Sequence, residues 1–135
     1  MRVMKMADIT AIHHVSLLVS DTARALLFYQ GVLGLEVDAS RPAMNYPGAW
    51  LRVGSAEIHL LELPDVLRGA TLPEHGGRDR HLALGVPDLD GVVAALEAAG
   101  VAYTPSRSGR RALFCRDPDG NAIELLEWTP SLGAD

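Results

Sequence analysis

The stretch Ile-His-His-Val-Ser-Leu-Leu-Val at residues 12–19 decides the fold of this chain. Read with the two-residue period of a β-strand, it divides into two faces. The face that begins at His13 continues through aliphatic side chains and suits packing against a helix, so we expect His13 to be structural. The opposite face carries His14 and Ser16 among aliphatic residues, and it suits the wall of a cavity.

A second stretch, His-Leu-Ala-Leu-Gly-Val at residues 81–86, divides in the same way and begins an internal repeat. His81 stands 67 positions after His14. At the other end of each half, residues 58–63 (IHLLEL) match residues 123–128 (IELLEW) at four of six positions. Beginnings and ends that match in the same order predict a duplicated module.

Each half is predicted to fold as a βαβββ module, with Asp21 and Asp88 as helix caps and Gly34 and Gly100 as helix ends. For the first half we expect strands at residues 12–19, 35–37, 49–53 and 57–62, and a helix at about 22–32. For the second half we expect strands at residues 81–86, 101–103, 111–116 and 122–128, and a helix between Asp88 and Gly100.

These elements predict an α+β fold in which two βαβββ modules in tandem form curled mixed β-sheets around a central cleft. Residues 8–63 are expected to form the first module and residues 81–128 the second. Residues 64–80, rich in glycine, proline and polar side chains, are expected to form the linker between them. We expect the whole to be one structural domain.

The composition is that of an ordinary globular protein, with 48% hydrophobic and 21% charged residues among 135. A net charge of −5 and scattered arginines argue against nucleic acid as a partner. Cys115 is the only cysteine, which excludes an intrachain disulfide and a cysteine metal cage. No apolar run is long enough to span a membrane, and the first eight residues lack the apolar core of a signal peptide. We therefore expect no membrane contact and a cytoplasmic location.

Four side chains at cavity-facing positions are candidate metal ligands. His14 and His81 are equivalent in the repeat, and so are His59 and Glu124. If the modules pack about a pseudo-twofold axis, we expect His14 to meet His81 and His59 to meet Glu124. Three imidazoles and one carboxylate suit zinc, manganese, iron(II), nickel or cobalt. The prediction is a central metal cleft with coordination positions open to a small-molecule substrate.

Each candidate also has a structural interpretation. A single inward-facing histidine is more often a hydrogen-bonded core residue than a ligand, and Glu124 could reach water from an edge strand. His59 is either a fourth ligand or a contact to substrate or to another ligand. His75 lies in the linker and is expected to be a solvated loop residue, unless that loop closes over the site.

The same segments resemble a known group of proteins, the vicinal oxygen chelate superfamily. Residues 14–21 (HVSLLVSD), 28–29 (FY) and 32–35 (VLGL) are similar to its first module, and residues 114–125 (FCRDPDGNAIEL) resemble its closing motif. This superfamily contains glyoxalase I, methylmalonyl-CoA epimerase, extradiol dioxygenases, and fosfomycin- and bleomycin-resistance proteins. The resemblance covers nearly the whole chain and implies paired βαβββ modules around a divalent metal ion.

By motif position, the resemblance places His14, His81 and Glu124 on the ligand positions of the superfamily. His59 falls where glyoxalase I has a glutamate or the epimerase a glutamine. The implied activity is that of a glyoxalase-like lyase or isomerase, in which the metal binds two vicinal oxygens and stabilises an enediolate or oxyanion. Glu124 would then be a catalytic residue as well as a ligand, because a displaced carboxylate can carry a proton.

Departures from the sequence patterns of the superfamily narrow the choice of activity. Phe114 stands where extradiol dioxygenases usually have an active-site tyrosine, which disfavours ring cleavage. Ser16 is a fair substitute for a threonine of fosfomycin-type thiol transferases, although no potassium-site loop is evident. The alternatives to a glyoxalase-like enzyme are a fosfomycin-type thiol transferase and a metal-free drug-binding protein of the bleomycin-resistance type. Arg52, Arg78 and Arg111 are candidates to hold an anionic substrate group. By analogy we expect a homodimer, whose metal site could take ligands from two subunits.

Overall fold

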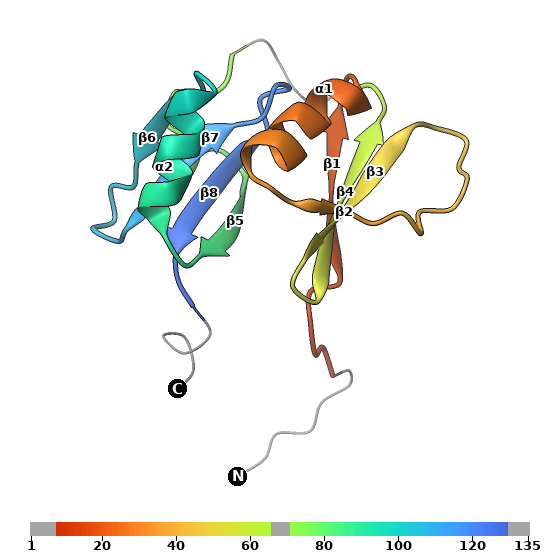
Figure 1. Cartoon of the computed structure of the whole chain (residues 1–135), viewed down its shortest axis with the longest axis horizontal. Helices are drawn as coiled ribbons and strands as arrows, with labels where there is room; N and C mark the ends of the chain where they lie inside the picture. Colours follow the sequence, from red (N-terminus) through yellow and green to blue (C-terminus); the bar gives the residue numbers. More distant parts are fainter. Residues whose placement is uncertain (1–7, 66–70, 130–135) are drawn as a thin grey trace.

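The computed structural model describes residues 8–65 and 71–129 (Figure 1). The expectation about a signal peptide and part of the predicted linker at 64–80 therefore fall outside the described residues. The first module contains β1 (His14–Val19), α1 (Thr22–Leu26), the π-helix η1 (Leu27–Val32), β2 (Glu36–Val37), β3 (Gly48–Val53) and β4 (Ala56–Glu62). The second contains the 3₁₀ turn η2 (Gly76–Arg78), β5 (His81–Val86), α2 (Leu89–Ala98), β6 (Tyr103–Pro105), β7 (Ala112–Arg116) and β8 (Ala122–Glu127).

The helices begin and end at the residues that the sequence predicts. The side chain of Asp21 accepts from the backbone N–H of Arg24 at the start of α1, and Asp88 caps α2 through Asp90 N–H. Beyond the helices, Gly34 and Gly100 adopt φ angles of 74° and 69°. These left-handed conformations cost glycine little, so each helical segment stops where the repeat predicts.

The two sheets have the same topology, with strand orders β1-β4-β3-β2 and β5-β8-β7-β6. In each, the first and last strands of the module pair in parallel and the remaining neighbours pair antiparallel. Ser16 lies opposite His59 in the first sheet, and Ala83 lies opposite Glu124 in the second. The predicted α+β fold of tandem modules with mixed sheets is therefore confirmed, and the equivalence of His59 and Glu124 holds in the strand register.

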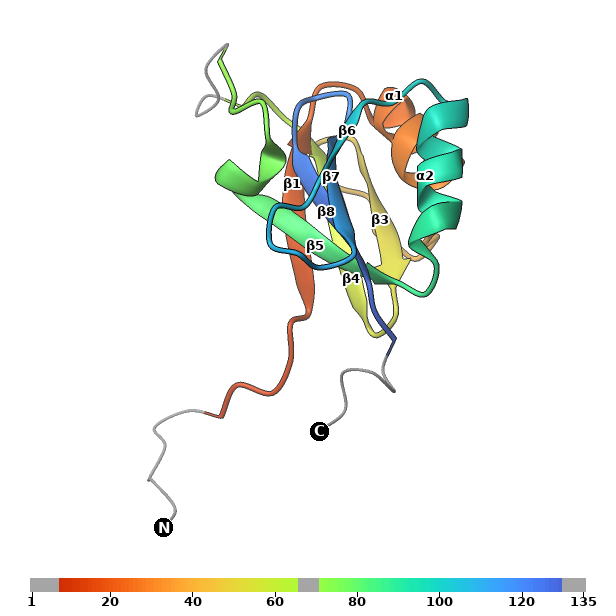
Figure 2. The same cartoon turned by 90° about the vertical axis from the view of Figure 1, so that its left-hand side faces the viewer.

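One face of each sheet packs into the core, and Figure 2 shows both helices on one side of the sheets. The buried aliphatic side chains of this core include Val19, Leu51, Ile58, Leu60, Leu84, Leu113, Ile123 and Leu125. The predicted helix-facing side of β1 is confirmed, but the structural role expected for His13 is wrong. His13 is exposed because the strand begins only at His14, and its ring lies edge-on to the ring of His14.

A buried polar network joins the modules at the turn between β7 and β8. The hydroxyl of Tyr29, on η1, donates to Asp117 Oδ2 at 2.6 Å. The side-chain amide of Asn121 donates to the backbone carbonyl of Leu18 at the end of β1, at 2.9 Å. Burial, reinforced by the nearby Asp117 carboxylate, raises the pKa of Tyr29, so its phenol stays protonated and remains a donor.

The segment that precedes β5 packs on the second module. Arg116, on β7, binds Asp79 at 2.8 Å and the carbonyl of Gly120 at 2.7 Å, and it also donates to the carbonyl of Pro73. These contacts fix the backbone immediately before His81. Within the described parts of the chain, no helix is long and apolar enough to cross a membrane.

Candidate metal and substrate site

The second module brings His81 and Glu124 together. His81 Nε2 lies 3.2 Å from Glu124 Oε1. Glu124 sits on β8, the strand that pairs with both β5 and β7, between the core residues Ile123 and Leu125. Only 3% of Glu124 is exposed, and burial of a carboxylate is costly unless charge or hydrogen bonds compensate it. Glu124 lies on an inner strand, so the interpretation that its carboxylate reaches water from an edge strand is wrong.

The second ring nitrogen of His81 defines its orientation. Nδ1 lies 3.0 Å from the backbone carbonyl of Asp79, which can only accept a hydrogen bond. Nδ1 therefore carries a proton, and Nε2 faces the Glu124 carboxylate. Two lone pairs so placed repel each other unless a proton or a metal ion lies between them. A metal-binding histidine usually donates one ring N–H to a backbone carbonyl and turns its other nitrogen to the ion, so a divalent ion fits between Nε2 of His81 and the Glu124 carboxylate.

The first module brings His14 and His59 together in a different way. Their rings stack with centroids 4.0 Å apart and planes inclined by 14°. On its other side His59 stacks on Trp50, with centroids 4.3 Å apart. His59 Nε2 also lies 2.9 Å from Glu57 Oε1, which accepts a hydrogen bond from it. Because ring lone pairs lie in the ring planes, two parallel stacked rings do not aim at one point. The stack therefore does not direct the lone pairs of His14 and His59 at one ion within the described part of the chain.

His14 is the more available of the two. Its ring is exposed, whereas only 9% of His59 is. Partial desolvation, with the neighbouring His59 as a smaller cause, lowers the pKa of His14, which favours the neutral form that binds metals. Its Nδ1 lies 2.8 Å from Nδ1 of His13, so one of these two nitrogens donates and Nε2 of His14 is left for another partner.

The candidates thus pair within each module, whereas the repeat predicts contacts between equivalent residues of the two modules. Among residues 8–65 and 71–129, no three histidine, cysteine, aspartate or glutamate side chains lie close enough to hold an ion. That His14, His59, His81 and Glu124 share one metal ion stays a prediction. A cleft of about 350 Å³ between β1 and β5 is lined by Ser16, His81, Arg80 and Asn121, together with aliphatic residues of both strands.

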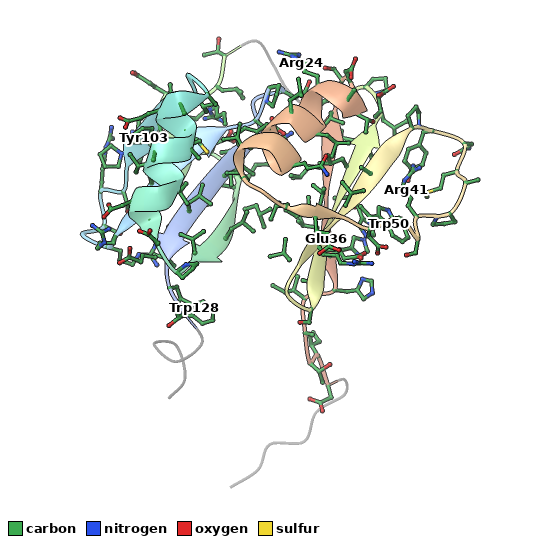
Figure 3. All side chains as sticks on the ribbon, viewed as in Figure 1. Arg24, Glu36, Arg41, Trp50, Tyr103 and Trp128 are labelled. Atoms are coloured by element: carbon green, nitrogen blue, oxygen red, sulfur yellow. The ribbon has the colours of Figure 1, made fainter. Side chains whose placement is uncertain are left out.

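Two aromatic residues lie beside the candidates, and of these Phe114 but not Trp50 was considered in the sequence analysis. Trp50 pairs with His59 across the first sheet, as Phe114 pairs with Glu124 across the second. Figure 3 shows the side chain of Trp50 on the first module, on the opposite side of the view from Tyr103 of the second module. Trp50 and Phe114 are 64 positions apart, whereas the repeat relates His14 to His81 at 67 and His59 to Glu124 at 65, so neither offset relates these two aromatic residues in the sequence.

The expectation that His75 is a solvated loop residue is wrong. Only 8% of His75 is exposed, and its Nδ1 lies 2.7 Å from Thr104 Oγ1. The rings of His75 and His81 both contact Phe114 edge-on, with centroids 4.9 and 5.0 Å away. The residues before β5 fold back onto the sheet, so His75 supports the ring that positions His81.

Arginines near the site differ in how firmly they are held. Arg52 binds the carboxylates of Glu36 and Asp38, and Arg111 is likewise paired with two carboxylates. Neither is free to take an anionic substrate group, whereas Arg78 is exposed. Arg110, which the sequence analysis did not select, lies 3.3 Å from Glu124 Oε2.

Comparison with known proteins agrees with this architecture. The family model of the Glyoxalase/Bleomycin resistance protein/Dioxygenase superfamily matches residues 11–125. A lactoylglutathione lyase of Haemophilus influenzae is 34% identical over 125 residues, which cover 84% of this chain and 90% of that protein. The uncharacterized protein YaeR of Escherichia coli is 33% identical over 90% of this chain and 99% of its own length.

Solved structures share the fold. TnmS3, an antibiotic binding protein from Streptomyces sp. CB03234, is 25% identical with a TM-score of 0.71, over 91% of this chain and 99% of its own. FosX, a fosfomycin resistance protein from Listeria monocytogenes solved with Mn(II), is 20% identical with a TM-score of 0.70, over 94% and 98%. The fold agrees with the family match, and the chain belongs to the Glyoxalase/Bleomycin resistance protein/Dioxygenase superfamily.

Proposed function

We propose that this chain is a divalent-metal-dependent lyase or isomerase of the glyoxalase type, which acts on a small substrate with vicinal oxygens. The observation that carries the proposal is the arrangement of His81 and Glu124, with Nε2 of His81 facing a buried carboxylate 3.2 Å away. Relatives about a third identical are named lactoylglutathione lyase, which supports the same class of reaction.

His14, His81 and Glu124 would hold the metal ion, and His59 is the weaker fourth candidate. When bound, a divalent ion supplies Lewis-acid polarisation of substrate oxygens. Glu124, whose side chain lies in the core, would hold the proton that moves between substrate atoms. His59, whose Nε2 is held by Glu57, is better suited to contact substrate than to bind the ion directly.

The pairing inside modules supports a homodimer. Each module presents two candidate donors, so a metal site with ligands from both modules could be completed by the first module of one subunit and the second module of its partner. Such an arrangement makes the metal site depend on assembly. A shared site of this kind also accounts for the observation that the His14–His59 pair and the His81–Glu124 pair do not come together within the described part of one chain.

Metal analysis of protein purified without an affinity tag or chelator tests the proposal. We expect close to one equivalent of divalent metal per chain, and a rise in thermal stability when Mn²⁺, Zn²⁺, Ni²⁺ or Fe²⁺ is added, because a ligand that binds only the folded state stabilises it. The loaded protein should turn over the hemithioacetal of an α-oxo aldehyde, an acyl-CoA epimer or an epoxide. Metal-loaded protein without turnover of any of the three would overturn the assignment to an enzyme.

A metal-free binding protein is the second candidate. The ring stack of His14, His59 and Trp50 forms an aromatic wall suited to a planar ligand. The structural similarity to the antibiotic binding protein TnmS3 favours the same possibility. Less than about a tenth of an equivalent of bound metal, with no thermal shift on addition of any of the four ions, would decide for this candidate.

A further inference from the structure

The carboxylate of Glu124 has a second partner that lies outside the candidate ligand set. Arg110 donates from Nη2 to Oε2 of Glu124 at 3.3 Å, whereas His81 faces the other oxygen at 3.2 Å. The side chain of Glu124 is 4% exposed and that of Arg110 is 58% exposed. A buried negative charge is therefore balanced by a cation that stands mostly in water.

Few other contacts hold Arg110 in this position. Its Nε donates to the hydroxyl of Ser108 at 3.2 Å, and Ser108 is itself exposed in the same loop. The next residue, Arg111, is by contrast fixed by two carboxylates at 2.9 and 3.2 Å. Within residues 8–65 and 71–129, Arg110 can therefore leave Glu124 without breaking another ion pair.

A metal ion bound by His81 and Glu124 would need the carboxylate that Arg110 now neutralises. With Arg110 in place, this group of side chains offers the ion no net charge, and with Arg110 withdrawn it offers one negative charge. A guanidinium and a divalent ion on one carboxylate repel each other, and the repulsion is strong where water is excluded.

We propose that Arg110 is a placeholder cation, which neutralises Glu124 in the metal-free protein and gives up that carboxylate when a divalent ion binds. The proposal rests on the metal site proposed above. Arg110 then acts on metal affinity through Glu124 and is a positioning residue without direct contact to the ion. Removal of the Arg110 side chain should lower the thermal stability of the metal-free protein, because a favourable ion pair is lost. It should raise the affinity for a divalent ion, because the competing cation is gone.

The test compares Arg110→Gln with the matched variant Arg107→Gln. Arg107 is exposed in the same loop and has no carboxylate partner among the described residues. In chelator-treated protein, Arg110→Gln should unfold at a lower temperature than Arg107→Gln. It should bind Mn²⁺ about threefold to tenfold more tightly than wild type, the range expected for loss of one partly exposed ion pair. Arg110→Lys, which keeps the charge, should return the Mn²⁺ affinity towards the wild-type value.

Titration calorimetry with Mn²⁺ alone gives the affinities and needs no substrate. If wild type binds Mn²⁺ and Arg110→Gln binds it no more tightly, the placeholder role is overturned and the proposed metal site stands. If wild type binds no Mn²⁺, the metal site fails and the placeholder role fails with it. Mn²⁺ affinity that rises equally in Arg107→Gln would also overturn the proposal, because a general charge effect would then explain the gain.

Discussion

Glu124 is the residue on which the proposed chemistry of the site depends. It is an ionisable group in a strand whose neighbours Ile123 and Leu125 belong to the core. A buried carboxylate raises the free energy of the folded state unless it is paired, and here His81 and Arg110 supply the two partners. An apolar side chain would serve this position better for stability alone, and this supports the proposal that Glu124 has a function.

Glu124→Gln tests this assignment. The amide keeps the shape of the side chain but loses the charge, so we expect the affinity for Mn²⁺ to fall at least about a hundredfold. The matched control is Glu127→Gln on the same strand, because Glu127 binds Arg111 away from the candidate ligands. Calorimetric titration with Mn²⁺ measures both variants. Equal affinities of wild type and Glu124→Gln would contradict the role of Glu124 as a ligand.

Cys115 is the residue whose reactivity the structure predicts directly. Burial, with Asp117 as the second cause, raises the pKa of its thiol from 9.0 to about 12. At pH 8 the thiolate fraction should be roughly a thousandfold below that of a free cysteine, so iodoacetamide should modify the native protein only after unfolding. Mass spectrometry after timed quenching measures the modification. Rapid labelling of the folded protein would contradict the burial of Cys115.

The same thiol links stability to pH. Above pH 9.0 the unfolded chain releases the thiol proton while the folded chain keeps it, so the free energy of unfolding falls as pH rises towards about 12. Between pH 8 and pH 10, wild type should lose about 1 kcal/mol more than Cys115→Ala in denaturant titrations. A loss that is equal in the two proteins would contradict the raised pKa.

At the scale of elements, turns and registers fix where the candidate residues lie. The turn between β7 and β8 contains Gly120 with φ of 88°, a conformation that other residues adopt only with strain. A Cβ atom there would also lie 2.8 Å from Leu72 Cδ1. The turn therefore depends on glycine both for its backbone and for the segment packed on it.

Gly120→Ala and Gly109→Ala separate these two effects. Gly109 has a similar φ of 84° but open space around it, so its alanine variant should lose only the backbone term, about 1 kcal/mol. Gly120→Ala should lose about 1 kcal/mol more, because Leu72 must move. The excess should vanish in a Leu72→Ala background. Denaturant titration provides the free energies, and equal losses in the two single variants would show that Leu72 does not pack on the turn.

Strand parity and the repeat were enough to predict the element order. They succeeded because alternation and capping are local properties of the chain. That His14, His81 and Glu124 form one site stays a prediction. The burial of His75 could not be predicted in this way, since it depends on how Arg116 draws a loop without periodicity onto β7. The pairing of donors within each module was also missed. It depends on the parallel register of first and last strands, which local patterns do not specify.

At the scale of the whole molecule, a few buried polar contacts hold the two modules in one arrangement. Asp117 accepts from Tyr29 of the first module and from the side chain of Asn121, which itself reaches the carbonyl of Leu18. Because these groups are buried, each contact that is broken leaves an unpaired polar atom. The modules should therefore unfold together.

Tyr29→Phe tests the coupling between the modules. Loss of a buried hydroxyl that donates to a carboxylate should cost about 1.5–3 kcal/mol, and the unfolding transition should stay single. Tyr103→Phe is the control, because the exposed hydroxyl of Tyr103 contacts Glu97 within its own module, and its loss should cost under about 0.5 kcal/mol. Two separated transitions in Tyr29→Phe, or no loss of stability, would contradict a connection that holds the modules together.

Mixed dimers test whether the metal site spans two chains. Chains that carry His14→Ala and chains that carry Glu124→Gln should each fail to bind Mn²⁺ while staying folded. If each site joins two subunits, random reassembly of the two variants restores about a quarter of the wild-type sites, since half of the dimers contain one intact site. A site within a single chain would recover nothing on mixing. Calorimetry before and after joint refolding distinguishes the two cases.

The parallel pairing of first and last strands has a consequence for motion. Each donor pair is carried by two strands that pair directly within one sheet, so the geometry of the pair is set inside that sheet. A displacement of one sheet against the other would change the width of the cleft between β1 and β5, while the separation of His81 and Glu124 would stay the same. The pair of side chains on which retention of an ion would depend is thus independent of the width of the cleft.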